Sequence, residues 1–149
     1  MTKFLGEYSA KIDDKGRVVF PSAFKALVPE GSEFIIKRNR FAPCLDVFTA
    51  SEWERQSEEL RSRLDTFFNP EDEMFWRDYT RGTATVVPDG KIGRISMPKR
   101  LLEHIGASKE VIFSGSGYKI EIWSRENFEQ HELSDQQFQA IAQRLSKQR

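Results

Sequence analysis

The sequence predicts an α+β protein, mainly β, in which two β-β-α-β-β-α repeats close about a pseudo-two-fold axis into a small barrel with external helices. The main observation is a repeated motif: Asp13–Pro21 recurs as Asp89–Pro98. Each copy has an acid, a lysine and Gly-Arg, then strand-forming residues and a proline. Further matches such as Phe48 with Trp123 keep a spacing of 75 to 77 residues, which indicates duplication over more than forty residues.

The first repeat is expected to occupy residues 1–79, with a core of about 6–50 and a helical extension. Alternation and β-branched residues predict strands at 6–12, 17–20, 33–37 and 45–49. Pro21 suits the first position of a short helix. Ser51 and Glu54 form a capping box, which predicts a helix from Ser51, and Asn69-Pro70 begins another.

The second repeat is expected to occupy residues 80–149, with a core of about 82–124 and C-terminal helices. Strands are predicted at 83–87, 94–97, 110–113 and 119–123, with the glycine-rich stretch 114–117 as the turn between the last two. Helices are predicted after Pro98, Ser124 and Ser134. Half a barrel would leave bare strand edges, so the two repeats are expected to bury their apolar faces together.

Composition limits the classes of protein to which the sequence can belong. The 149 residues are 38% hydrophobic and 31% charged, as in a globular domain with a real core. One cysteine and two histidines make a poor metal inventory, so we predict no metal and no cofactor, and Cys44 is expected to be buried by packing. No apolar run reaches membrane-spanning length and the N-terminus lacks a signal peptide pattern, which predicts a cytoplasmic protein without membrane contact.

Charge is balanced overall but unevenly placed. Residues 91–100 contain four cations and no acid, whereas residues 52–78 contain nine acids against four arginines. Opposed patches of this kind can steer an anionic partner to one face of a neutral protein.

The duplicated turns suit recognition of double-stranded DNA. The arginine fork can donate two hydrogen bonds to guanine, and Arg17 and Arg94 each begin a strand directly after a tight turn. Asp13 and Asp89 are the candidate acids that orient them. The remaining cations near the turns are predicted to contact phosphates, which position a protein on DNA without reading sequence. They are Lys15, Lys91, Lys99 and Arg100.

These residues resemble the MraZ family of bacterial regulators, whose halves are swapped-hairpin domains of the SpoVT/AbrB type. The resemblance covers nearly the whole chain and rests on a duplicated D-x-x-x-R, met by Asp13 and Arg17, and on Glu121-Ile122-Trp123 followed by a helix. In the second copy four residues, not three, separate Asp89 from Arg94.

The resemblance implies a sequence-specific, DNA-binding transcriptional regulator of the cell-division and cell-wall gene cluster. It implies a ring-like homo-oligomer, associated with the nucleoid, that binds repeated short G-containing promoter elements. Several weak contacts on clustered sites gain affinity through effective concentration, which is a physical reason to expect an oligomer. The exposed candidates for self-association are Phe67-Phe68 and Phe75-Trp76.

Two other classes were weighed. An enzyme with paired aspartates is disfavoured because each acid lies in a lysine- and arginine-rich turn, and no nucleophile motif or phosphate loop is present, so neither catalysis nor a small-molecule substrate is expected. An antitoxin-like or other protein-interaction barrel remains the alternative. Antitoxins of this type usually carry a disordered acidic tail, whereas this chain ends in a predicted mixed-charge helix.

Overall fold

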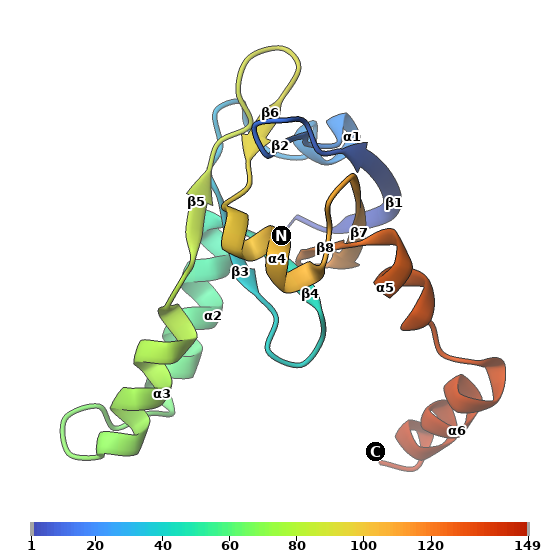
Figure 1. Ribbon diagram of the computed structural model, residues 1–149. Helices are drawn as coiled ribbons and strands as arrows, with labels where there is room; N and C mark the ends of the chain where they lie inside the picture. The colour runs from blue at the N-terminus through green and yellow to red at the C-terminus, as the bar shows by residue number, and fades with distance from the viewer. Residues whose placement is uncertain (1, 149) are drawn as a thin grey trace.

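A six-stranded sheet forms the centre of the computed structural model, which describes residues 2–148, and helices flank the sheet (Figure 1). The predicted α+β class is therefore confirmed. The strands are β1 (Phe4–Lys11), β2 (Arg17–Val19), β3 (Phe34–Arg38), β4 (Cys44–Thr49), β5 (Ala84–Val86), β6 (Arg94–Ser96), β7 (Glu110–Gly117) and β8 (Ile120–Trp123). The helices are α1 (Ser22–Lys25), α2 (Ala50–Ser62), α3 (Pro70–Thr80), α4 (Lys99–Ile105), α5 (Arg125–Gln130) and α6 (Asp135–Ser146).

The strand order has internal symmetry. Six antiparallel strands run in the order β1-β7-β8-β4-β3-β5, and β2 pairs with β6 in a separate two-stranded ribbon. The first strand of each half lies beside the third strand of the other half, because β1 pairs with β7 and β5 pairs with β3. The two halves therefore exchange strands. The division into units 1–79 and 80–149 stays a prediction.

The expected closed barrel is not confirmed. β1 and β5 form the two edges of the six-stranded sheet, and no ladder between described residues joins them. The short β2–β6 ribbon forms a sheet of its own instead of bridging these edges. Strand length accounts for this: β2, β5 and β6 have three residues each, too few to close a continuous ladder.

One apolar cluster joins the sheet, the ribbon and the short helices α1 and α4. Phe20, 1% exposed, contacts the rings of Phe24, Phe34 and Phe113, with centroid separations of 6.5, 4.6 and 5.6 Å. Val18 and Ile95 bring the ribbon into the same cluster. The ribbon is thus fixed to the rest of the fold by its inner face.

Two local predictions were wrong. Thr49, not Ser51, caps α2, because its hydroxyl accepts from the Glu52 N–H at 3.2 Å. Residues 114–117 continue β7 instead of forming a turn. A Cβ on Gly115 would lie 2.5 Å from the Leu5 nitrogen, so glycine there allows β1 to approach closely.

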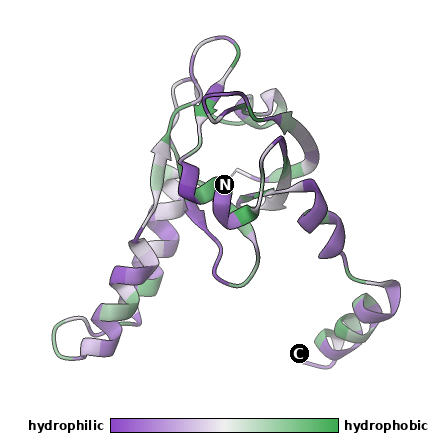
Figure 2. Ribbon diagram, in the orientation of Figure 1, coloured by the Kyte–Doolittle hydropathy of each residue, from purple (hydrophilic) through white to green (hydrophobic). Residues whose placement is uncertain are grey.

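Two helical arms extend from the sheet on opposite sides in Figure 1: α2 with α3, and α5 with α6. Hydrophilic and hydrophobic residues alternate along α3 and α6 (Figure 2), and several apolar side chains there are exposed. Examples are Phe67, Phe68 and Phe75 in the first arm and Phe138 and Leu145 in the second. Among residues 2–148, no helix combines the length and apolar character that a bilayer crossing requires.

Candidate nucleic-acid interface

The β2–β6 ribbon presents both repeated arginines on one face. Arg17 lies opposite Ser96, and Val19 lies opposite Arg94. Residues two apart on a strand, and residues directly opposite across an antiparallel pair, share a face. Val18 and Ile95 fill the inner face and are buried, so Arg17 and Arg94 lie on the outer one. The structure therefore brings together the two arginines that the sequence singled out.

The first turn holds Arg17 through its side chain. Arg17 Nε donates to Asp13 Oδ2 at 2.8 Å. The other carboxylate oxygen, Oδ1, accepts from the backbone N–H groups of Arg17 at 2.8 Å and Lys15 at 2.9 Å. The two terminal nitrogens of the guanidinium are not used in this contact. The predicted Asp13–Arg17 pair is present, although it joins through Nε alone and is not bidentate.

These contacts favour the ionised form of Asp13. The Arg17 backbone N–H, together with the Arg17 guanidinium and the Lys15 N–H, outweighs desolvation and holds the pKa of the Asp13 carboxyl below its ordinary value of 3.8. Asp13 is therefore charged at neutral pH and keeps the Arg17 side chain in a fixed orientation.

The second turn holds Arg94 through its backbone only. Asp89 Oδ1 accepts from the Arg94 N–H at 3.0 Å, and Asp89 and Arg94 also form an isolated β-bridge. Within residues 2–148 no ion pair joins the Asp89 carboxylate to the Arg94 guanidinium. The predicted role of Asp89 as an acid that orients the Arg94 side chain is thus not supported by its contacts, because the extra residue changes the turn.

Each turn is tied to the opposite half of the chain. The Phe20 N–H donates to the Gly93 carbonyl at 2.8 Å, and the Met97 N–H donates to the Gly16 carbonyl at 2.9 Å. Gly16 and Gly93 have φ of 77° and 78°, a conformation that glycine adopts at little cost. The duplicated glycines therefore set the geometry through which each half supports the turn of the other.

The remaining predicted cations differ in their surroundings. Lys15 and Lys91 are exposed in the turns. Lys99 is exposed at the start of α4, which has seven residues. One terminal nitrogen of Arg100 already has a hydrogen-bond partner, because Nη2 donates to the Gly82 carbonyl at 3.0 Å. The DNA-binding roles of all these residues stay predictions.

Three residues near the turns were missed by sequence reasoning. Val19, 43% exposed, and Ser96 share the outer ribbon face with the arginines. Lys25 of α1 packs against the second turn, where a Cβ on Gly93 would lie 3.1 Å from its Nζ. Strand period would have placed Val19 and Ser96, whereas the contact of Lys25 depends on tertiary structure.

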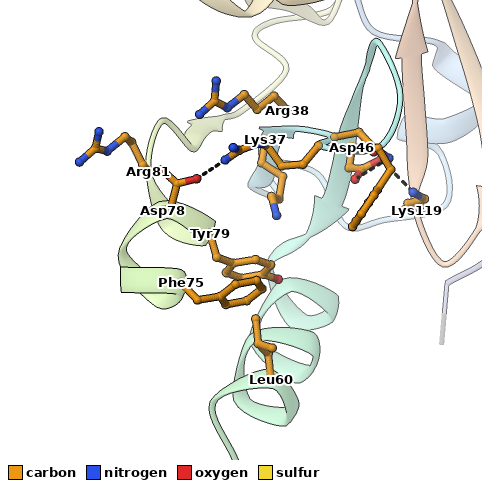
Figure 3. A pocket seen from close by; sticks show the side chains of 12 residues that line it. Lys37, Arg38, Asp46, Leu60, Phe75, Asp78, Tyr79, Arg81 and Lys119 are labelled. Carbon is orange, nitrogen blue, oxygen red and sulfur yellow. Dashed lines mark hydrogen bonds and ion pairs between the residues drawn. The ribbon is translucent and has the colours of Figure 1, made fainter. Parts of the chain in front are cut away.

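A hollow of about 600 Å³ lies elsewhere, between α3 and the strands β3 and β4 (Figure 3). Its lining combines basic and aromatic side chains from segments far apart in the sequence, including Lys37, Tyr79 and Lys119. No sequence motif connects these segments, so the hollow could not be predicted from the sequence.

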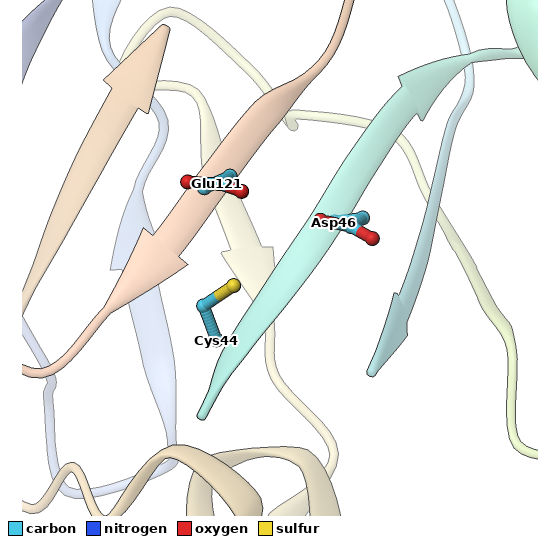
Figure 4. Close-up of side chains that lie close together, drawn as sticks. All are labelled: Cys44, Asp46 and Glu121. Carbon is cyan, nitrogen blue, oxygen red and sulfur yellow. The ribbon is translucent and has the colours of Figure 1, made fainter. Parts of the chain in front are cut away.

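Cys44, Asp46 and Glu121 lie close together on β4 and β8 (Figure 4), with potential ligand atoms within 4.8 Å of one another. Lys119 Nζ already pairs with Asp46 at 2.9 Å and with Glu121 at 3.2 Å. Burial raises the pKa of the Cys44 thiol to about 12, which disfavours the thiolate that binds metals. The group is a partly buried ion-pair cluster beside a packed cysteine, and Cys44 is buried as expected.

Comparison with known proteins identifies the family of the chain. The family described as "MraZ protein, putative antitoxin-like" matches residues 3–78 and again residues 80–149. The chain belongs to the MraZ family. The resemblance inferred from the repeated D-x-x-x-R motif is therefore confirmed.

Several MraZ relatives match over most of their length. A protein of Bacteroides thetaiotaomicron named "Transcriptional regulator MraZ" is 34% identical over 147 residues, covering 97% of this chain and 93% of the relative. Proteins of the same name from Dictyoglomus thermophilum and Clostridium acetobutylicum are 36% and 34% identical. They cover 85% and 96% of this chain, and 83% and 96% of their own lengths.

Proposed function

We propose that this MraZ family member is a DNA-binding transcriptional regulator that reads sequence with the outer face of the β2–β6 ribbon. The observation that carries the proposal is the placement of Arg17 and Arg94 on one face of a two-stranded ribbon whose other face is buried. The names of the relatives, all transcriptional regulators, support the same class.

The dimensions of the ribbon suit double-stranded DNA. The major groove, about 12 Å wide, admits a two-stranded β-ribbon, and arginine is the commonest reader of guanine there. Arg17, oriented by Asp13, supplies terminal N–H groups for a guanine. Val19 presents an apolar surface suited to a thymine methyl group. Lys15, Lys91, Lys99 and Arg100 supply the phosphate contacts that fix the register.

The proposed target and assembly follow the family resemblance. We infer that the chain binds repeated short G-containing elements in the promoter of the cell-division and cell-wall gene cluster, as a homo-oligomer associated with the nucleoid. Phe67 and Phe68, 92% and 89% exposed, and Phe75 in the first arm offer apolar surface for contact between copies. A head-to-tail contact of this kind closes into a ring when its rotation permits.

An antitoxin-like protein-interaction function is the second candidate, because the family description includes those words. The C-terminal segment favours the regulator: residues 135–146 form the capped helix α6, with a Ser134–Gln137 capping box, and not an acidic tail without structure.

Fluorescence anisotropy with labelled promoter duplexes tests the proposal. One duplex carries the G-containing repeats and the other a scrambled sequence of equal length, over a salt series. We expect preference for the repeats and a linear fall of log affinity with log salt. Equal, weak binding to both duplexes would contradict the regulator and favour a protein partner.

A further inference from the structure

The hollow beside α3 carries an excess of positive charge. Its lining includes five cationic and two anionic side chains. Two of the cations are neutralised, because Lys119 pairs with Asp46 and Arg40 pairs with Asp78. Lys37, Arg38 and Arg81 make no ion pair with any residue in the range 2–148. Lys37, Arg38 and Arg81 therefore line the hollow without a direct ion pair. The Asp46 carboxylate acts on Lys37, and the Asp78 carboxylate on Arg38 and Arg81, from a greater distance.

The charged form of Lys37 is disfavoured in this arrangement. Its Nζ lies 3.7 Å from the centroid of the Tyr79 ring and 5.9 Å from that of Trp53. Burial, and the nearby cations Lys119 and Arg40, lower the pKa of Lys37, although Asp46 acts in the opposite sense. The aromatic faces stabilise the ammonium only in part. An anion in the hollow would supply the missing charge.

A stack of aromatic rings forms the opposite wall. Phe75 lies over Tyr79 with a centroid separation of 6.4 Å and an interplanar angle of 14°, and Tyr79 stacks on Trp53 at 5.5 Å and 7°. Figure 3 shows the Phe75 and Tyr79 rings side by side above Leu60. Phe75 is 54% exposed, so part of its surface is free to pack against another flat group.

We propose that this hollow binds a nucleoside phosphate. The phosphates would pair with Arg38 and Arg81, whose planar guanidinium groups suit bidentate contact with phosphate oxygens. The base would pack against the exposed part of Phe75, beside Leu60. A volume of about 600 Å³ lies within the range of small-molecule sites in proteins.

The site is distinct from the DNA-reading ribbon. Arg81 precedes β5 and the second turn follows β5, so the two sites lie at opposite ends of that strand. None of the ribbon residues lines the hollow. The proposal therefore does not rest on the proposed DNA function, and its test leaves the ribbon unchanged.

Isothermal titration calorimetry of the full chain tests the site with ATP, adenosine and inorganic tripolyphosphate as separate probes, in buffer without divalent metal. We expect ATP to bind at least about tenfold more tightly than either fragment, because only ATP has both the charge and the base. Quenching of tryptophan fluorescence is expected to accompany binding, since Trp53 stacks on Tyr79. No binding of ATP at about 5 mM, with folding verified by circular dichroism, would overturn the proposal.

Variants locate the site. The double variant Arg38→Gln/Arg81→Gln is expected to bind ATP about 100-fold more weakly, at about tenfold per lost contact. Phe75→Leu is expected to reduce the advantage of ATP over tripolyphosphate. The control Arg144→Gln/Lys147→Gln removes the same charge from the exposed end of the C-terminal arm and should keep ATP affinity.

Three results would contradict the assignment in different ways. Equal weakening in the control would show attraction by net charge alone, and equal affinity for tripolyphosphate and ATP would remove the base from the proposal. Arg17→Ala should retain ATP binding, and its loss there would move the nucleotide to the ribbon. Each of these outcomes is independent of whether the promoter repeats are bound.

Discussion

The two Gly-Arg turns share a backbone and differ in how they hold the arginine side chain. In both, the N–H of the acid donates to the carbonyl of the arginine, and the carbonyl of a left-handed glycine accepts from the other half. Only the first turn adds a side-chain ion pair, between Asp13 and Arg17. In the second, the Asp89 carboxylate bonds the Arg94 N–H and no other group among residues 2–148.

This difference separates two requirements that the repeated motif combines. The strand-opening backbone tolerates one inserted residue, because the hydrogen bonds of Gly93 and Arg94 are kept. The orientation of the guanidinium does not tolerate the insertion, because it depends on where the carboxylate of the acid points. A preorganised Arg17 loses less side-chain freedom on binding than Arg94 does, so the turns are expected to contribute unequally to base recognition.

The largest expected effect concerns the residues that anchor the two turns. Phe20→Ala should lower the free energy of unfolding by about 4 kcal/mol, because it removes a ring buried among three others. Met97→Ala at the equivalent position, 5% exposed, should cost about 2 to 3 kcal/mol. Urea unfolding measures both, and a larger loss for Met97→Ala would reverse the ranking.

Removal of each arginine tests the comparison in DNA binding. Arg17→Ala should weaken binding to the repeats by about 2 kcal/mol, and Arg94→Ala by about 1 kcal/mol, because only Arg17 is oriented in advance. Lys15→Ala serves as the control and should weaken binding to repeats and scrambled duplex alike, with a shallower salt slope. Anisotropy measures all three, and equal effects of the two arginines would remove the proposed difference.

Asp13→Asn isolates the ion pair and predicts a pH dependence. The contacts of Asp13 lower its pKa in the folded chain, so its stabilising contribution is present above the unfolded-state pKa of about 3.9 and is lost as pH falls through the lower folded value. The difference in unfolding free energy between wild type and Asp13→Asn should therefore be constant near neutral pH and shrink below about pH 4.

Urea unfolding at several pH values measures this difference, and carboxyl NMR titration gives the midpoint of Asp13 directly. In DNA binding, the same variant should lose about fivefold of its preference for the repeats. An Asp13 midpoint at or above 3.8 would be incompatible with the contacts seen in the first turn.

The smallest expected effect comes from shortening the second turn. Deletion of Ile92, which is 53% exposed, gives Asp89-Gly90-Lys91-Gly93-Arg94, with the spacing of the first turn. The Asp89 carboxylate should then pair with the Arg94 guanidinium, and the preference for the repeats should rise by no more than about fivefold. Anisotropy with both duplexes measures this preference, and an unchanged preference would show that turn length alone does not control the pair.

Much of the fold could be predicted because local residues determine it. The duplicated motif, the β-branched runs and the prolines located the strands and the helix starts, and Pro70 begins α3 as expected. Barrel closure could not be predicted, since it depends on whether three-residue strands reach one another in space. The extension of β7 through residues 114–117 depends on the approach of β1, which no local pattern records.

The same distinction applies to the site. The Asp13–Arg17 contact followed from spacing within one turn. The hydrogen bond from Arg100 to the Gly82 carbonyl is a tertiary contact. The hollow lined by Lys37, Arg81 and Tyr79 also depends on tertiary structure. Sequence spacing therefore predicted the side-chain contact of the first turn. It missed the changed contact of the second turn, and it missed the contacts made between segments.

The exchange of β1 and β5 between the halves has a consequence for how the two turns can diverge in sequence. A fold in which each half completes the sheet of the other has the design of a dimer of two half-length chains. In such a dimer, one gene would encode both turns, and any insertion would appear twice. Once both halves are encoded in tandem, insertion of a single codon can lengthen one turn while the other keeps its ion pair. One subunit can then carry two turns that hold their arginines differently.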